Sequence, residues 1–167
     1  MSKSNGQAKQ YPIGELCKLI NGRAFKPSEW TTTGLPIIRI QNLNDTTKEF
    51  NYFDGEYSER HEVNDGELLF SWSGTPGTSF GAFFWNRGKA VLNQHIFRVL
   101  VEPDRVDKDY FRYAMNSRLD RIINQAHGGV GLKHITKGKL EAVTVPLPPL
   151  SEQKRIAGIL DLSLIHI

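Results

Sequence analysis

The sequence has a single cysteine and no long hydrophobic run in its 167 residues. One cysteine excludes an internal disulfide framework and a cysteine-based zinc site. Cys17 has apolar neighbours in "GELCKLI", so we expect a small core residue and not a reactive thiolate. The polar residues 1–10, "MSKSNGQAKQ", lack the apolar segment of a secretory signal, and no run approaches a membrane span. These absences predict a cytoplasmic protein with a disordered leader over residues 1–10.

Motifs for catalysis and cofactor binding are also missing. The chain has no phosphate-binding G-x-x-x-x-G-K-[ST] loop, and its histidines lack the H-x-x-x-H and H-E-x-x-H spacings of metal sites. "GTSFG", residues 77–81, matches the G-x-S-x-G pattern of serine hydrolases. That pattern requires a strand before it and a helix after it, whereas here Pro76 precedes and the strand-like "AFFW" follows. We therefore predict no catalytic residue, no metal and no cofactor in this chain, and keep a serine hydrolase as an alternative that Ser79→Ala would test.

The positive charge is unevenly distributed. The whole chain carries +3, yet the segment 121–155 has six basic and two acidic residues. A local excess of this kind suits a polyanionic partner, although a solvated charged face is the alternative explanation. The length and the 39% apolar content fit one globular domain with its own core.

Short β-strand patterns fill the first two thirds of the chain. Runs rich in β-branched and aromatic residues, separated by Gly, Pro and Asn, predict strands at Ile37–Ile40 and within residues 66–74, 78–85 and 89–102. From Asp107 the period changes, and an apolar stripe predicts a helix that Asp107 caps and Gly128-Gly129 ends. We predict an α/β (α+β) fold with a mixed, largely antiparallel twisted sheet and packed helices.

The segment 143–161, "VTVPLPPLSEQKRIAGILD", predicts a strand, a proline hinge and a helix. The helical pattern 136–140 precedes it, the prolines end the strand, and Ser151 is a suitable N-cap. Ile156, Ile159 and Leu160 would share one face of the helix. Two turns are too short to be stable alone, so the helix either docks on the domain or continues and docks on a partner.

Polar and basic residues recur in the predicted loops at the ends of the strands. Side chains of these types read base edges in duplex DNA or contact its phosphates. Each could equally be an ordinary surface or turn residue. The candidates for DNA contact are Arg39, Gln41, Asn42, Ser73, Thr75, Gln94, His95 and Lys133, with Lys26, Arg87 and Lys137 as phosphate neutralisers.

The segment "GLKHITKGKLEAVTVPLPPLSEQKRIAGILD" resembles the end of a target recognition domain, and the start of the long helix after it, in the DNA-specificity subunit of type I restriction-modification systems. "GLPIIRIQNLN", "GELLFSWSGTPGT" and "LNQHIFRV" look like earlier parts of the same domain, so the resemblance covers residues 11–161. It implies a target recognition domain at 11–149 and the start of the conserved spacer helix at 150–161. The ending "LSLIHI", residues 162–167, departs from the family pattern, and we expect it to be a non-native tail.

The resemblance also implies a function and partners. The subunit would read one half of a bipartite target in double-stranded DNA and catalyse nothing itself. Its expected partners are methyltransferase subunits, a restriction endonuclease subunit and a second recognition domain, in the same chain or by dimerisation. S-adenosylmethionine and ATP would belong to those partners. The alternative is a non-catalytic protein-assembly module with incidental DNA affinity.

Overall fold

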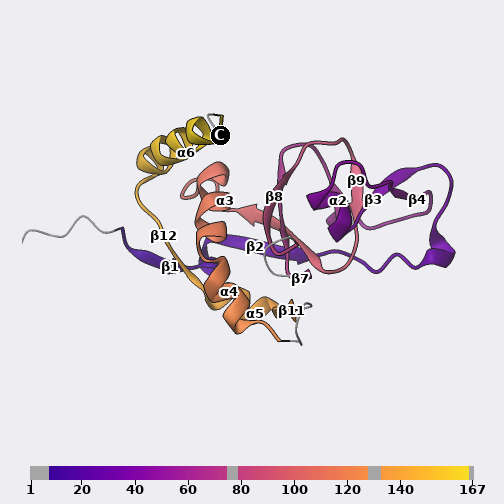
Figure 1. The fold of residues 1–167 in the computed structure, drawn as a ribbon, viewed down its shortest axis with the longest axis horizontal. Coiled ribbons are helices and arrows are strands. Elements are labelled where there is room, and N and C mark those ends of the chain that lie inside the picture. Colours follow the sequence, from indigo (N-terminus) through magenta and orange to yellow (C-terminus); the bar gives the residue numbers. More distant parts are fainter. Residues whose placement is uncertain (1–7, 75–78, 128–132, 166–167) are drawn as a thin grey trace, which may run out of the picture.

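An antiparallel four-stranded sheet has the order β2-β10-β6-β8. It lies at the centre of the fold, where Figure 1 labels β2 and β8. The computed structural model describes residues 8–74, 79–127 and 133–165. The strands of this sheet are β2 (Cys17–Asn21), β6 (Glu67–Ser71), β8 (Gly81–Trp85) and β10 (Ile96–Val101). The inner strand β6 has buried residues on both of its faces, which explains the uninterrupted apolar run "LLF".

A second four-stranded sheet has the order β4-β3-β9-β5. Its strands are β3 (Leu35–Ile38), β4 (Asn51–Phe53), β5 (Glu62–Val63) and β9 (Ala90–Leu92), with 3-10 turns at Pro27–Glu29 and Glu59–His61. Strands β3 and β9 are parallel, and the other pairs are antiparallel. The predicted mixed, largely antiparallel sheet is therefore confirmed. The predicted strand at Ile37–Ile40 is β3, but Ile40 already begins the short helix α2 (Ile40–Asn44).

The two faces of the central sheet contribute to different apolar clusters. Phe70 and Phe97 pack with Phe111 and Met115 of the helical layer in the main core. Leu69, the neighbour of Phe70, points to the opposite face and packs in the smaller cluster beneath the second sheet. Successive strand residues alternate between faces, so one strand serves both cores.

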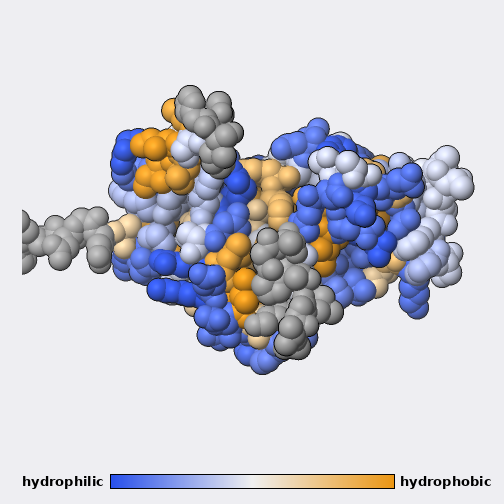
Figure 2. All heavy atoms as spheres, viewed as in Figure 1, coloured by the Kyte–Doolittle hydropathy of each residue, from blue (hydrophilic) through white to orange (hydrophobic). Residues whose placement is uncertain are grey.

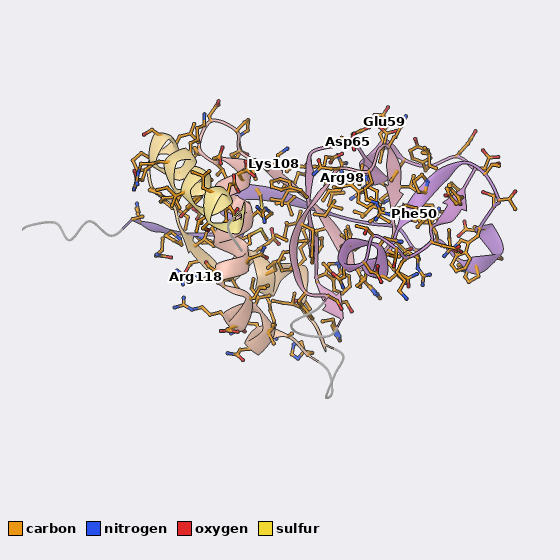
Figure 3. The ribbon with its side chains drawn as sticks, turned by 45° about the horizontal axis from the view of Figure 1, so that its top comes forward. Phe50, Glu59, Asp65, Arg98, Lys108 and Arg118 are labelled. Carbon is orange, nitrogen blue, oxygen red and sulfur yellow. The ribbon has the colours of Figure 1, made fainter. Side chains whose placement is uncertain are left out.

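The predicted helix after Asp107 forms as two helices, α3 (Lys108–Ser117) and α4 (Leu119–Gln125). Asp107 caps the first as predicted, because its carboxylate accepts a hydrogen bond from the Tyr110 amide at 3.0 Å. Arg118, labelled in Figure 3, leaves the helical conformation at φ −103° and ψ 9° and separates them. The predicted stop at Gly128-Gly129 lies outside the described residues, and α4 ends before it.

The C-terminal third forms the expected sequence of elements around the edge of the core. Thr136 caps α5 (Lys137–Ala142), and β12 (Thr144–Pro146) pairs with β1 (Gln10–Pro12), which leads into α1 (Ile13–Leu16). The short β11 (Lys133–His134) pairs with β7 (Ser73–Gly74). The long helix α6 (Leu150–Ile165) follows the prolines and lies beside α3 (Figure 1).

Two boundary predictions need correction. The helix α6 begins at Leu150, with the carbonyl of Pro149 accepting hydrogen bonds from the amides of Glu152 and Gln153, so Ser151 lies inside the first turn and is not the N-cap. Gln10, assigned to the leader, belongs to β1, while residues 1–7 lie outside the described part. The helix continues past residue 161 to Ile165, and the non-native origin expected for residues 162–167 stays a prediction.

Cys17 is buried in the main core, which confirms the prediction for this residue. Burial raises the pKa of its thiol to about 12, with a smaller contribution from the charge of Glu141. A thiol with this pKa carries almost no thiolate at neutral pH, so it is chemically inert there.

Candidate nucleic-acid interface

Two segments far apart in sequence form one small hollow of about 230 Å³. One is the turn from β3 into α2, and the other is the loop between β9 and β10. Strands β3 and β9 are parallel, so their carboxyl ends emerge at the same edge of the sheet. The Asn93 amide continues this pairing with a 3.1 Å hydrogen bond to the Ile38 carbonyl. The residues lining the hollow are Arg39, Ile40, Gln41, Asn93, Gln94 and His95.

Four of the predicted DNA contacts therefore come together: Arg39, Gln41, Gln94 and His95. Gln41 and Gln94 are exposed. The guanidinium of Arg39 lies over the ring of Trp30, 5.3 Å from its centroid, and among the described residues no carboxylate lies within salt-bridge distance of it. The hollow thus offers one unpaired cation and the two exposed carboxamides of Gln41 and Gln94 to a ligand.

Asn42 does not fit the prediction that it contacts DNA. Its side chain is 2% exposed. Its Oδ1 accepts a hydrogen bond from the Arg39 amide at 3.0 Å, and its Nδ2 donates to the carbonyls of Lys48 and Glu49, each at 3.4 Å. This side chain closes the first turn of α2 from inside, so it positions Arg39 and Gln41 and cannot itself reach DNA.

His95 has an unusual backbone conformation at the edge of the hollow. Its φ of 74° lies in the left-handed region, which non-glycine residues rarely adopt. The Trp72 amide donates to the His95 carbonyl at 3.1 Å, and the two rings meet edge to face at 4.8 Å. Trp72 is held in turn by a 3.0 Å hydrogen bond from its Nε1 to Asn21. These contacts stabilise a strained backbone that presents the imidazole at the hollow.

The surroundings of His95 favour the uncharged imidazole. Burial lowers its pKa below the ordinary value of 6.5, and the charge of His134 lowers it further. A neutral imidazole carries one donor and one acceptor nitrogen, so it can bond either kind of base-edge group.

The remaining base-reading candidates lie near the β7–β11 pair. Ser73 is buried and pairs with His134 across the two strands, which corrects its assignment as an exposed contact. The backbone of Lys133 pairs with that of Gly74. The DNA contact predicted for the Lys133 side chain stays a prediction, because this side chain is not among those that the structure describes. Thr75 also falls outside the described residues.

The three predicted phosphate neutralisers have different surroundings. Lys26 and Lys137 are exposed. Arg87 is half-buried, with its guanidinium over the ring of Phe50 at 4.5 Å and its Nη1 donating to the Asn42 carbonyl at 3.1 Å. Arg87 thus supports the end of α2, and its contact with phosphate stays a prediction.

Sequence reasoning missed some residues that shape this surface. Asn93 lines the hollow and accepts a 3.2 Å hydrogen bond from the Phe25 amide. A second, larger hollow of about 430 Å³ lies between α4, α5 and β12, and Arg121 and Lys139 contribute two cations to it. The local charge excess in residues 121–155 was the available signal for the second hollow. Asn93 stands in the same polar loop sequence as Gln94 and His95, but no local pattern indicates its hydrogen bond with the Phe25 amide.

Helix α6 has an exposed apolar side. Ile159 is 53% and Leu162 60% exposed, Leu160 is also exposed, and Ile156 is half-buried. Figure 2 shows hydrophobic atoms gathered over this helix. Of the three residues predicted for partner contact, Ile159 and Leu160 are exposed to a partner. Ile156 is less accessible, because it packs against the main core.

The described residues contain no group of three or more His, Cys, Asp or Glu side chains able to hold a metal ion. None of the helices in the described part of the chain has the length and apolar character needed to cross a membrane.

Comparison with known proteins agrees with this architecture. The chain is 33% identical over 160 residues to the type I restriction enzyme EcoBI specificity subunit of Escherichia coli, covering 93% of this chain and 32% of that subunit. It is 31% identical over 153 residues to the MjaVIII specificity subunit of Methanocaldococcus jannaschii, covering 89% and 34%. The chain therefore spans about a third of the length of these relatives.

Solved structures share the fold. The S subunit of a type I restriction-modification system from M. genitalium superposes with a TM-score of 0.70 at 19% identity, over 97% of this chain and 40% of that one. The HsdS subunit from Thermoanaerobacter tengcongensis gives 0.70 at 18% identity, over 96% and 38%. A family model, the type I restriction modification DNA specificity domain, matches residues 5–163. The chain belongs to this family.

Proposed function

We propose that this chain is a target recognition domain that reads one half of a bipartite target in double-stranded DNA. The observation that carries the proposal is the convergence of Arg39, Gln41, Gln94 and His95 on one hollow. Membership of the specificity-domain family supports it. No other part of the described surface joins so many of the candidate base-reading side chains.

The side chains of the hollow suit base edges in the major groove. Arginine donates two hydrogen bonds to guanine, glutamine exchanges two with adenine, and each good pair gives roughly 1–3 kcal/mol of discrimination. The parallel strands and Asn42 hold these groups in place before DNA arrives. Lys26 and Lys137 are the phosphate contacts in this proposal, because both are exposed cations.

The partners follow from the same family. We infer that the chain works in the cytoplasm with methyltransferase subunits, a restriction endonuclease subunit and a second recognition domain. The exposed apolar side of α6 supports contact with another polypeptide. In this arrangement the chain performs no catalysis, and S-adenosylmethionine and ATP are bound by the partners.

A protein-assembly module with incidental DNA affinity is the second candidate. The same apolar side of α6 favours it, since this surface needs a protein partner whether or not DNA is read. The two functions differ in their DNA binding. Sequence-specific recognition adds about 4 kcal/mol or more to nonspecific affinity, whereas incidental contact responds to salt alone.

Selection from a randomised duplex library tests the proposal. The chain is used with a co-expressed type I methyltransferase subunit, and a salt titration follows on the enriched sequence. We expect one short motif to be enriched. Absence of enrichment while the methyltransferase subunit is demonstrably bound would contradict DNA reading by this chain and favour the assembly module.

A further inference from the structure

Gln153 joins the start of α6 to the start of α3. Its side chain is 0% exposed, and its amide is fully hydrogen-bonded. The Oε1 accepts from the Asp107 amide at 2.8 Å, while the Nε2 donates to the carbonyls of Arg105 and Pro148, both at 2.8 Å. A buried carboxamide with every partner satisfied specifies one local arrangement, because any displacement leaves polar groups unpaired.

Two further residues on the same face of α6 continue this contact. Ala157 is buried against the main core, and Asp161 accepts a hydrogen bond from the Tyr113 hydroxyl of α3. The Arg112 guanidinium also lies 3.8 Å from the Asp161 carboxylate. Gln153, Ala157 and Asp161 are spaced four residues apart, so they form one stripe. A helix held at three points over about 12 Å has a defined direction.

A rigid path connects this stripe to the hollow. Asn116 of α3 exchanges two hydrogen bonds with the backbone of Ala82 in β8, at 2.8 and 3.1 Å. Strand β8 belongs to the central sheet, and β10 of that sheet follows directly from the loop that carries Gln94 and His95. The orientation of α6 is therefore fixed relative to the reading residues by hydrogen-bonded elements throughout.

We propose that Gln153, assisted by Tyr113 and Asp161, is a positioning residue that sets the direction of α6 and so selects the separation of the two half-sites. The inference rests on the proposed function. Helix α6 has 16 residues and is about 24 Å long. A tilt of roughly 10° moves its far end by about 4 Å, more than the roughly 3.4 Å rise of one base pair. A subunit that distinguishes half-site separations differing by one base pair therefore needs the direction of α6 to be fixed within about this angle.

The experiment uses the full specificity subunit containing this chain, bound to its methyltransferase subunits. Binding is measured on duplexes that carry both half-sites with the spacer lengthened or shortened one base pair at a time. Gln153→Glu keeps the acceptor for Asp107 and places a carboxylate against the carbonyls of Arg105 and Pro148. Tyr113→Phe removes a single hydroxyl. The matched control is Glu152→Gln, next to Gln153, whose carboxylate pairs with Arg155 in solvent.

We expect Gln153→Glu to reduce the preference for the native spacing by about threefold to tenfold, with binding to a single half-site unchanged within about twofold. Tyr113→Phe should give a smaller loss, and the control none. A folded Gln153→Glu variant with the wild-type spacing preference would overturn the proposal. Parallel loss of single-half-site binding would also overturn it, because Gln153 would then serve general stability.

Two further results separate this inference from the proposed function. If Gln153→Glu does not fold, the spacing preference of the Tyr113→Phe variant tests the proposal instead. An unchanged spacing preference in that variant counts against the proposal. A wild-type subunit that prefers one sequence but tolerates every spacing contradicts the positioning role alone. A wild-type subunit without any sequence preference contradicts the proposed function itself.

Discussion

At the scale of single residues, two neighbours on α2 have opposite roles. Asn42 is buried and hydrogen-bonded, whereas Gln41 is exposed at the hollow. Asn42→Ala should lower the free energy of unfolding by about 1–3 kcal/mol, because the Arg39 amide loses its buried acceptor. Gln41→Ala should change it by less than about 0.5 kcal/mol. Urea denaturation of both variants checks this, and equal stabilities would contradict the role given to Asn42.

His95 gives the stability a pH dependence. Its folded-state pKa is lowered, chiefly by burial, so between that value and 6.5 the unfolded chain binds more protons. Stability therefore falls as pH decreases through this window. His61, whose pKa is also lowered chiefly by burial, adds a contribution of the same sign. His95→Asn, which tolerates the left-handed backbone, should flatten the pH dependence of unfolding below 6.5. An unchanged slope would contradict this account.

At the scale of elements, the hollow depends on close contact between Gly22, which directly follows β2, and the loop after β9. A Cβ on Gly22 would lie 1.8 Å from the Asn93 carbonyl oxygen, so Gly22→Ala must displace this loop. We expect it to cost at least about 1–3 kcal/mol of stability and to abolish specific DNA binding. Gly138→Ala is the control, since nothing lies within 4 Å of its Cβ in α5, and alanine favours a helix. Unfolding and binding assays on both variants check the prediction.

The elements differ in how far the sequence predicts them. Strands β3, β6 and β8 follow from apolar runs between turn residues, and β9 and β10 appear as expected in residues 89–102. The sequence does not predict β2, β4 and β5. The sequence predicts a loop where α2 forms, because "IQNLN" is largely polar. The hydrogen bond from the Arg39 amide to the Asn42 side chain depends on the burial of Asn42, which the local sequence does not show. The break at Arg118 has no proline or glycine to mark it. The hollow itself results from the parallel pairing of β3 with β9, a contact between distant segments that no local pattern encodes.

At the scale of the whole molecule, a DNA-reading domain should bind with a steep salt dependence. Each phosphate neutralised contributes roughly 0.9 to the slope of log affinity against log salt concentration. Lys26→Ala and Lys137→Ala should each weaken binding equally on all sequences and reduce the slope by about that amount. Lys154→Ala, an exposed cation on α6, is the control and should leave the slope unchanged. Unaltered slopes in the first two variants would remove these lysines from the interface.

The proposed function depends on base reading by the hollow between α2 and the β9–β10 loop. The most direct measurement repeats the randomised-duplex selection, in complex with the methyltransferase subunit, for the wild-type chain and for Gln94→Ala. We expect the variant to retain the overall motif and to lose preference at one position, by about 1–3 kcal/mol. An identical motif at full strength for both proteins, or weakening that is uniform over all positions, would contradict base reading by this hollow.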